Sequence, residues 1–127
     1  MLSCFFLLAD NEEPNITCPD NDTVTTDSGQ NFTLFALPPE VSAVDNSELQ
    51  VTITIDVDGV MYSVGDSVQL DLADSPHLVQ YTATDNSSNT ATCDTYVTVN
   101  GRYIPVGKFV YGSNTFCAYN VPLVHAL

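Results

Sequence analysis

The sequence predicts an all-β fold, an antiparallel β-sandwich of about seven to eight short strands. Three observations predict it. Apolar and polar residues alternate from Val51 to Val57, which is the period of a strand with one buried face. Asp58-Gly59 follows at once and then a second apolar run, the strongest short signal for a β-hairpin. No stretch of the chain shows the 3.6-residue apolar spacing of an amphipathic helix.

The other strands are assigned on the same grounds, in chain order. Before the hairpin, short β-prone runs predict strands at 16–18, 23–26 and 32–37. Pro38-Pro39 ends the third of these, because proline supplies no N–H for pairing. The hairpin itself joins strands at 51–57 and 60–62. After it, alternation predicts strands at 68–72, 79–84 and 91–99.

The last strand has a predicted inner and outer face. Ala91, Cys93, Thr95, Val97 and Val99 are expected to face the core, with Thr92, Asp94 and Thr98 facing water. Tyr96 is expected on the face opposite Val97. It is either an aromatic contact for a neighbouring module or a cover for its own sheet.

Charge divides the 127-residue chain into parts. All 16 acidic residues lie between Asp10 and Asp94, and the two basic residues, Arg102 and Lys108, follow them. We therefore expect a folded domain at 10–100 and a separate tail at 101–127, which is either the start of another module or a segment that does not fold. Residues 1–9 form a short apolar stretch without basic residues, either a truncated secretory signal or a loose N-terminal segment.

The net charge of −14 restricts the partners. Nucleic acids and anionic membrane surfaces are disfavoured, because binding to them relies on Lys and Arg. No apolar run reaches the roughly 18–20 residues of a transmembrane helix. Between residues 10 and 100, each carboxylate must be solvated, hydrogen-bonded or bound to an external cation, because that stretch contains no Lys or Arg. Cations and basic protein surfaces are the expected partners.

The cysteines bear on the cellular compartment. Cys18 and Cys93 fall in the first and last predicted strands, and a disulfide between them would close nearly the whole domain. A zinc site is less favoured, because there is no Cys-x-x-Cys motif and neither His77 nor His125 has ligand spacing. Two buried free thiols are the remaining alternative. Cys4 and Cys117 are assigned no partner.

Four sequons for N-glycosylation occur, at Asn15, Asn21, Asn31 and Asn86. Together with a disulfide and the lack of lysine between residues 10 and 100, they indicate an extracellular protein, secreted or on the cell surface.

Several segments form an ordered set of motifs: 16–20, 23–30 and 43–47, then 62–66, and finally 81–93 with 97–99. This set resembles the hyalin repeat, or HYR domain. The first three segments resemble its opening half, 62–66 resembles its short Val-Gly turn, and the last two resemble its closing half. Cys18 and Cys93 match cysteine positions of the family. Ser88 stands where the family usually has Gly, and a left-handed conformation there would cost roughly 1 kcal/mol.

The resemblance implies an immunoglobulin-like sandwich that acts as a non-catalytic adhesion or matrix module. Its partners would be neighbouring repeats or other extracellular modules. Antibody-type domains fit less well, because the chain has no Trp. An enzyme is not expected either, since a hydrolytic triad needs a positioned histidine and His77 is predicted to be an exposed loop residue.

Calcium binding is the alternative function, and no other cofactor is expected. Hard oxygen ligands are plentiful in the acidic domain. The candidates are Asp20, Asp22, Asp27, Asp45, Glu48, Asp56, Asp58 and Asp85. A tight turn explains Asp56 to Gly59 better than a calcium loop does, because the downstream acidic ligands of such a loop are missing. Calcium would act at a defined site or by screening the repulsion between acidic surfaces.

Overall fold

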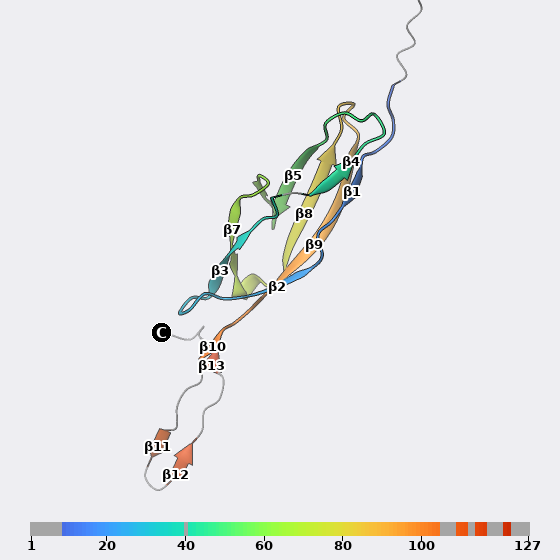
Figure 1. Ribbon diagram of the computed structural model, residues 1–127. Helices are drawn as coiled ribbons and strands as arrows, with labels where there is room; N and C mark the ends of the chain where they lie inside the picture. The colour runs from blue at the N-terminus through green and yellow to red at the C-terminus, as the bar shows by residue number, and fades with distance from the viewer. Residues whose placement is uncertain (1–8, 40, 105–108, 112–113, 117–120, 123–127) are drawn as a thin grey trace, which may run out of the picture. The chain divides into compact units, whose positions relative to one another are not determined.

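The computed structural model describes residues 9–39, 41–104, 109–111, 114–116 and 121–122, with side chains up to Arg102 (Figure 1). These residues contain β-strands and one short 3₁₀ helix, η1 (Leu72–Asp74), and no α-helix. The predicted all-β class is confirmed. Nine strands, β1 to β9, lie between Asn15 and Asn100. The remaining strands are β10 (Tyr103–Ile104), β11 (Phe109–Tyr111), β12 (Asn114–Phe116) and β13 (Val121–Pro122). Cys4, Cys117 and His125 lie outside the described residues.

The chain divides into two compact units, each assembled from three separate segments. The first unit comprises Met1–Asp20, Pro38–Asp66 and Val79–Thr95. The second comprises Asn21–Leu37, Ser67–Leu78 and Tyr96–Leu127. The two longest strands, β8 (His77–Thr84) and β9 (Thr90–Asn100), contribute residues to both units.

The first unit contains strands from two sheets. β1 (Asn15–Thr17) pairs antiparallel with β4 (Ser42–Val44). β5 (Thr52–Val57) pairs antiparallel with β6 (Val60–Tyr62) and with β8. The alternation of the sequence places Ile55, Tyr81 and Ala83 on the inner face, where each is at most 1 % exposed. Burial raises the pKa of the Tyr81 phenol.

The second unit also buries apolar side chains from two sheets. β3 (Phe32–Ala36) pairs antiparallel with β7 (Ser67–Asp71), and β2 (Asp22–Thr25) pairs with the last residues of β9. Its buried apolar residues are Leu37, Val68, Leu70, Val97 and Val99. In both units, strands of separate sheets enclose the buried side chains, which is the layered arrangement of a β-sandwich.

One pairing differs from the predicted, wholly antiparallel order. β2 runs parallel to β9, with Asp22 opposite Val97 and Thr25 opposite Asn100. Parallel neighbours require a long connection, and here most of the domain separates the two strands in sequence. Nothing in the local pattern of either strand reports this orientation.

The predicted hairpin is confirmed in its backbone. Asp58 and Gly59 have φ values of 51° and 90°, the positive angles that a two-residue type I′ turn requires at both positions. The Gly59 N–H donates to Asp56 Oδ1 at 2.7 Å. Asp56 is therefore a turn-stabilising residue, as the sequence indicates.

The predicted faces of β9 are also confirmed. Thr95, Val97 and Val99 are buried, and Cys93 is half-buried. Tyr96 lies on the opposite face and is 47 % exposed.

The prediction that His77 is an exposed loop residue is wrong. His77 is 3 % exposed, and its Nε2 lies 2.7 Å from the backbone oxygen of Asp71. The reason is that β8 begins two residues earlier than expected, so that His77 continues the buried series of Val79 and Tyr81.

Among the described residues, no helix has the length and hydrophobicity needed to cross a membrane.

Candidate functional site

Three carboxylates converge in the first unit, and we call them the acidic cluster: Asp10, Asp45 and Asp85. One oxygen from each lies within 4.8 Å of the other two. Asp10 precedes β1 and Asp45 follows β4. The antiparallel pairing that sets Asn15 opposite Val44 brings these two segments together. Asp85 follows the last residue of β8.

Asp85 is held by the turn that it begins. Its Oδ1 accepts the backbone N–H groups of Ser87 and Asn89, both at 2.8 Å, and its Oδ2 accepts the Asn89 side-chain amide at 2.7 Å. Burial, which leaves the residue 7 % exposed, raises the pKa of this carboxyl. The hydrogen bonds from Asn89, Ser87 and Ser88 lower the pKa and outweigh burial, so that it lies below its ordinary value.

Asp45 begins a second turn and keeps one oxygen unpaired. Its Oδ2 accepts the Ser47 N–H at 3.1 Å and also the Ser47 hydroxyl, and its backbone oxygen accepts the Glu48 N–H at 3.3 Å. Its Oδ1 is buried and has no hydrogen-bond partner among the described residues.

Asp10, like Asp45, accepts hydrogen bonds through only one of its two carboxylate oxygens among the described residues. Its Oδ1 accepts the Glu12 N–H at 3.2 Å and lies 3.5 Å from the Asn46 side-chain amide, and its backbone oxygen accepts the Asn89 amide at 3.1 Å. Its Oδ2 is buried and receives no hydrogen bond from the part of the chain that the structure describes. Two carboxylate oxygens of the cluster are thus buried without a hydrogen bond from any described residue, an arrangement that costs free energy unless a ligand compensates it.

The acidic cluster has the chemistry of a site for a hard divalent cation. Ca²⁺ takes about six to eight oxygen ligands, and carboxylates are its main protein ligands. No Lys or Arg occurs between residues 10 and 100 to neutralise the cluster. Asp10 and Asp45 would each offer an uncommitted oxygen, and Asp85 would add charge and remaining lone pairs.

Of the predicted calcium ligands, Asp45 and Asp85 belong to the acidic cluster and the others do not. Asp22 Oδ1 accepts the Thr23 N–H at 2.7 Å, and Asp27 Oδ1 accepts the Thr33 hydroxyl at 3.3 Å. Asp20, Asp58 and Glu48 are exposed. Glu48 and Asp58 have positive φ, which identifies them as turn residues.

Sequence reasoning missed Asp10. Its role depends on the pairing of β1 with β4, and β4 was not predicted. The only available signal was its position at the start of the acidic stretch.

A disulfide joins Cys18 to Cys93, and this prediction is confirmed. The bridge spans 75 residues with a Cα–Cα distance of 5.8 Å. Cys18 directly follows β1, and Cys93 lies in β9. The bridge therefore connects the two sheets of the first unit and excludes both the zinc site and the free-thiol alternative for this pair.

All four sequon asparagines, Asn15, Asn21, Asn31 and Asn86, are exposed. Asn21 Oδ1 also accepts the Tyr96 N–H at 2.9 Å. Glycosylation at these positions stays a prediction.

Comparison with family descriptions, curated proteins and solved structures found no match for this chain.

Proposed function

We propose that this chain is a non-catalytic extracellular module of adhesion or matrix assembly, which acts through contacts with other proteins. The observation that carries the proposal is the Cys18–Cys93 disulfide, which joins the two sheets of the first unit. Such bridges persist in oxidising compartments and are rare in the cytosol. The exposed sequon asparagines support the same compartment.

The hyalin-repeat resemblance supports the proposal from the sequence side. Its closing motif includes Cys93, and its opening motif includes Cys18. Ser88, which stands where the closing motif usually has Gly, has a φ of 70°, a conformation that favours glycine. An immunoglobulin-like strand arrangement is part of this proposal.

Secretion from eukaryotic cells tests the proposal. The full chain, placed behind a cleavable secretory signal, should appear in the medium, oxidised and carrying N-glycans that N-glycosidase removes. In a variant with Asn15, Asn21, Asn31 and Asn86 all changed to Gln, N-glycosidase should leave the electrophoretic mobility of the chain unchanged. Retention of the parent chain inside the cell, reduced and without glycans, would contradict the proposal.

Calcium binding is the second candidate function, and the buried unpaired oxygens of Asp10 and Asp45 favour it. A bound cation would link the segment before β1 to the turns after β4 and β8. Extracellular calcium modules have dissociation constants of about 10⁻⁴–10⁻³ M. At 10 mM Ca²⁺, such a site would raise the free energy of unfolding by about 1.4–2.7 kcal/mol.

Thermal unfolding with EDTA and with 10 mM CaCl₂ tests this candidate. Asp10→Asn and Asp45→Asn should lose most of the calcium-dependent rise in Tm. Asp94→Asn, which changes an exposed carboxylate outside the cluster, should keep it. Equal loss in all three variants would indicate screening by diffuse charge instead. No calcium effect on the parent chain would eliminate the candidate.

A further inference from the structure

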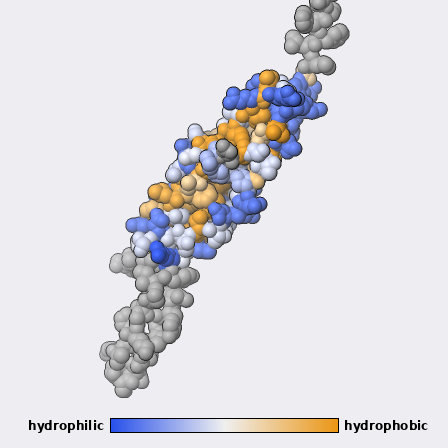
Figure 2. All heavy atoms as spheres, in the orientation of Figure 1, coloured by the Kyte–Doolittle hydropathy of each residue, from blue (hydrophilic) through white to orange (hydrophobic). Residues whose placement is uncertain are grey.

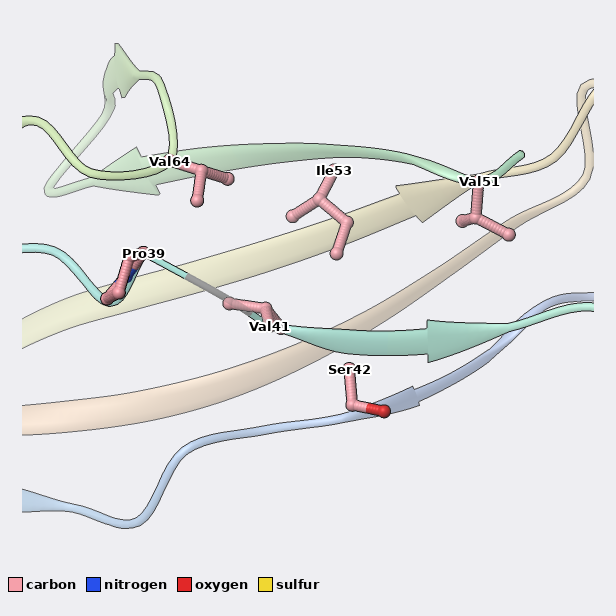
Figure 3. Close-up of a pocket in the computed structure, with 6 residues that line it drawn as sticks. All are labelled: Pro39, Val41, Ser42, Val51, Ile53 and Val64. Carbon is pink, nitrogen blue, oxygen red and sulfur yellow. The ribbon is translucent and has the colours of Figure 1, made fainter.

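We propose that the first unit binds an extended segment of a basic partner protein in an apolar hollow between β4 and β5. The inference rests on the proposed function, because it names the surface and the kind of partner for the protein–protein contact. The hollow has a volume of about 650 Å³ and is broadly open to solvent, and Figure 3 shows the residues that line it. It is lined by Pro39, Val41, Ser42, Val51, Ile53 and Val64. We call it the β4–β5 hollow.

The hollow is where the inner face of β5 loses its cover. Val51 and Ile53 share a face with Ile55 and Val57, because alternate residues of a strand point the same way. Ile55 and Val57 are at most 3 % exposed, whereas Val51 and Ile53 are only half-buried. In Figure 3, Val51, Ile53 and Val64 point from the β5 side toward β4. Figure 2 shows the resulting hydrophobic surface on this unit, bordered by hydrophilic surface.

Two strand edges border the hollow without a partner among the described strands. β4 pairs with β1 alone. β6 pairs with β5 only from Ile55 to Val57, which leaves the same edge of Thr52–Thr54 unpaired. Exposed edges of this kind offer rows of N–H and C=O groups to an added strand. β-Augmentation uses those groups for affinity and uses pockets under alternate side chains for specificity.

Charge identifies the occupant as basic. Asp45 directly follows β4, and Asp66 follows Val64 by two residues at the turn where its Oδ2 accepts the Ser63 N–H. With 16 acidic residues and no Lys or Arg between residues 10 and 100, a second copy of this domain would be repelled. A segment with alternating apolar residues and flanking Lys or Arg matches both the hollow and its surroundings.

Peptide binding to the oxidised full chain tests the proposal. The probe is a labelled peptide, Lys-Lys-Val-Thr-Val-Thr-Val-Lys-Lys, and its comparison replaces all four lysines with glutamate. We expect saturable binding of the lysine peptide, at least tenfold tighter than that of the glutamate peptide. Val64→Glu should weaken binding at least tenfold. Val60→Glu is the matched control, because Val60 is 55 % exposed on β6 and does not line the hollow, and it should leave binding unchanged.

Other outcomes would overturn the proposal. Unchanged or tighter binding by Val64→Glu would show that binding follows overall charge and not the hollow. Equal loss in Val64→Glu and Val60→Glu would show that binding does not depend on the hollow, and no binding at 1 mM peptide would remove the site. Dimerisation of the parent chain that Val64→Glu abolishes, seen by sedimentation, would identify a second copy as the occupant. Tighter binding of a peptide with the sequence of residues 1–9 would identify this chain's own segment. If Val64→Glu does not fold, Val64→Thr replaces it in the binding measurement. Secretion and glycosylation would be unaffected by these results, so the proposed function stands or falls separately.

Discussion

The side chain of Asn89 donates to Asp85 Oδ2 at 2.7 Å, and its backbone N–H donates to Asp85 Oδ1 at 2.8 Å. The Asn89 side-chain amide also donates to the backbone oxygen of Asp10 at 3.1 Å. One residue of the β8–β9 turn thus fixes an acid of the cluster and anchors the segment before β1. The arrangement favours the charged form of Asp85, and this has a consequence for stability in acid.

Stability should fall as the pH drops below the ordinary aspartate pKa of 3.8, partly because of Asp85. Its pKa is lowered in the folded state, so the unfolded chain binds the proton more readily. The stabilisation is present above pH 3.8 and is lost as the pH falls through the lowered pKa. Unfolding of the parent and Asp85→Asn chains in urea, from pH 6 to pH 2 with EDTA, checks this. Asp85→Asn should depend less on pH, and Asp94→Asn should behave like the parent. A parent-like slope for Asp85→Asn would contradict the assignment.

Ser88→Gly should stabilise the chain by about 0.5–1 kcal/mol. Ser88 has a φ of 70°, where a side chain costs about 1 kcal/mol or more, partly offset by the greater freedom of glycine in the unfolded state. The substitution also removes the Asn86 sequon, so the measurement is urea unfolding of oxidised chain made without glycans. Ser87→Gly is the neighbouring control, since Ser87 does not have positive φ, and it should not stabilise. A destabilised Ser88→Gly chain would show that the serine side chain has a role of its own.

The turn of the β5–β6 hairpin should depend on glycine at position 59. Gly59 has a φ of 90°, and a Cβ there would meet nothing within 4 Å. Gly59→Ala should therefore destabilise by about 1–2 kcal/mol through the backbone alone. Gly59→Asn should lose less, because asparagine tolerates the left-handed region. Thermal unfolding of the two variants measures these losses of stability. An equal loss in Gly59→Ala and Gly59→Asn would show that the positive φ is not the cause.

Local features of the sequence predicted these turns and most strands correctly. The Asp58-Gly59 pair and the alternation from Val51 to Val57 are signals within single segments, and both are present in the structure. His77 was placed wrongly, although it fits the alternation of β8, because the preceding Pro76 suggested a loop.

Features that depend on the pairing of strands distant in sequence were not predictable. β4 has only three residues and follows two prolines, so its pattern is too short to read. Without β4, nothing in the sequence places Asp10 beside Asp45, and the acidic cluster could only be guessed at through Asp45 and Asp85. The parallel orientation of β2 and β9 was missed for a similar reason, because it depends on the pairing of two distant strands and not on the pattern of either one.

Removal of the disulfide should be the most damaging of these changes. Closing a loop of 75 residues restricts the unfolded chain and contributes about 4–5 kcal/mol by chain-entropy arithmetic. The double variant Cys18→Ser/Cys93→Ser should lose this amount or fail to fold, as measured by urea unfolding against the oxidised parent. Reduction of the parent chain should give the same loss. Full stability in the double variant would show that packing alone suffices.

Peptide mapping of the secreted chain without reduction tests the central claim most directly. Trypsin cannot cut between residues 10 and 100, which contain no Lys or Arg, whereas cleavage before aspartate releases 10–19 and 85–93. The account predicts that these two peptides are recovered as one disulfide-linked species, with glycan released by N-glycosidase from Asn15 or Asn86. Recovery of the two peptides as separate free thiols, without glycan, would contradict it.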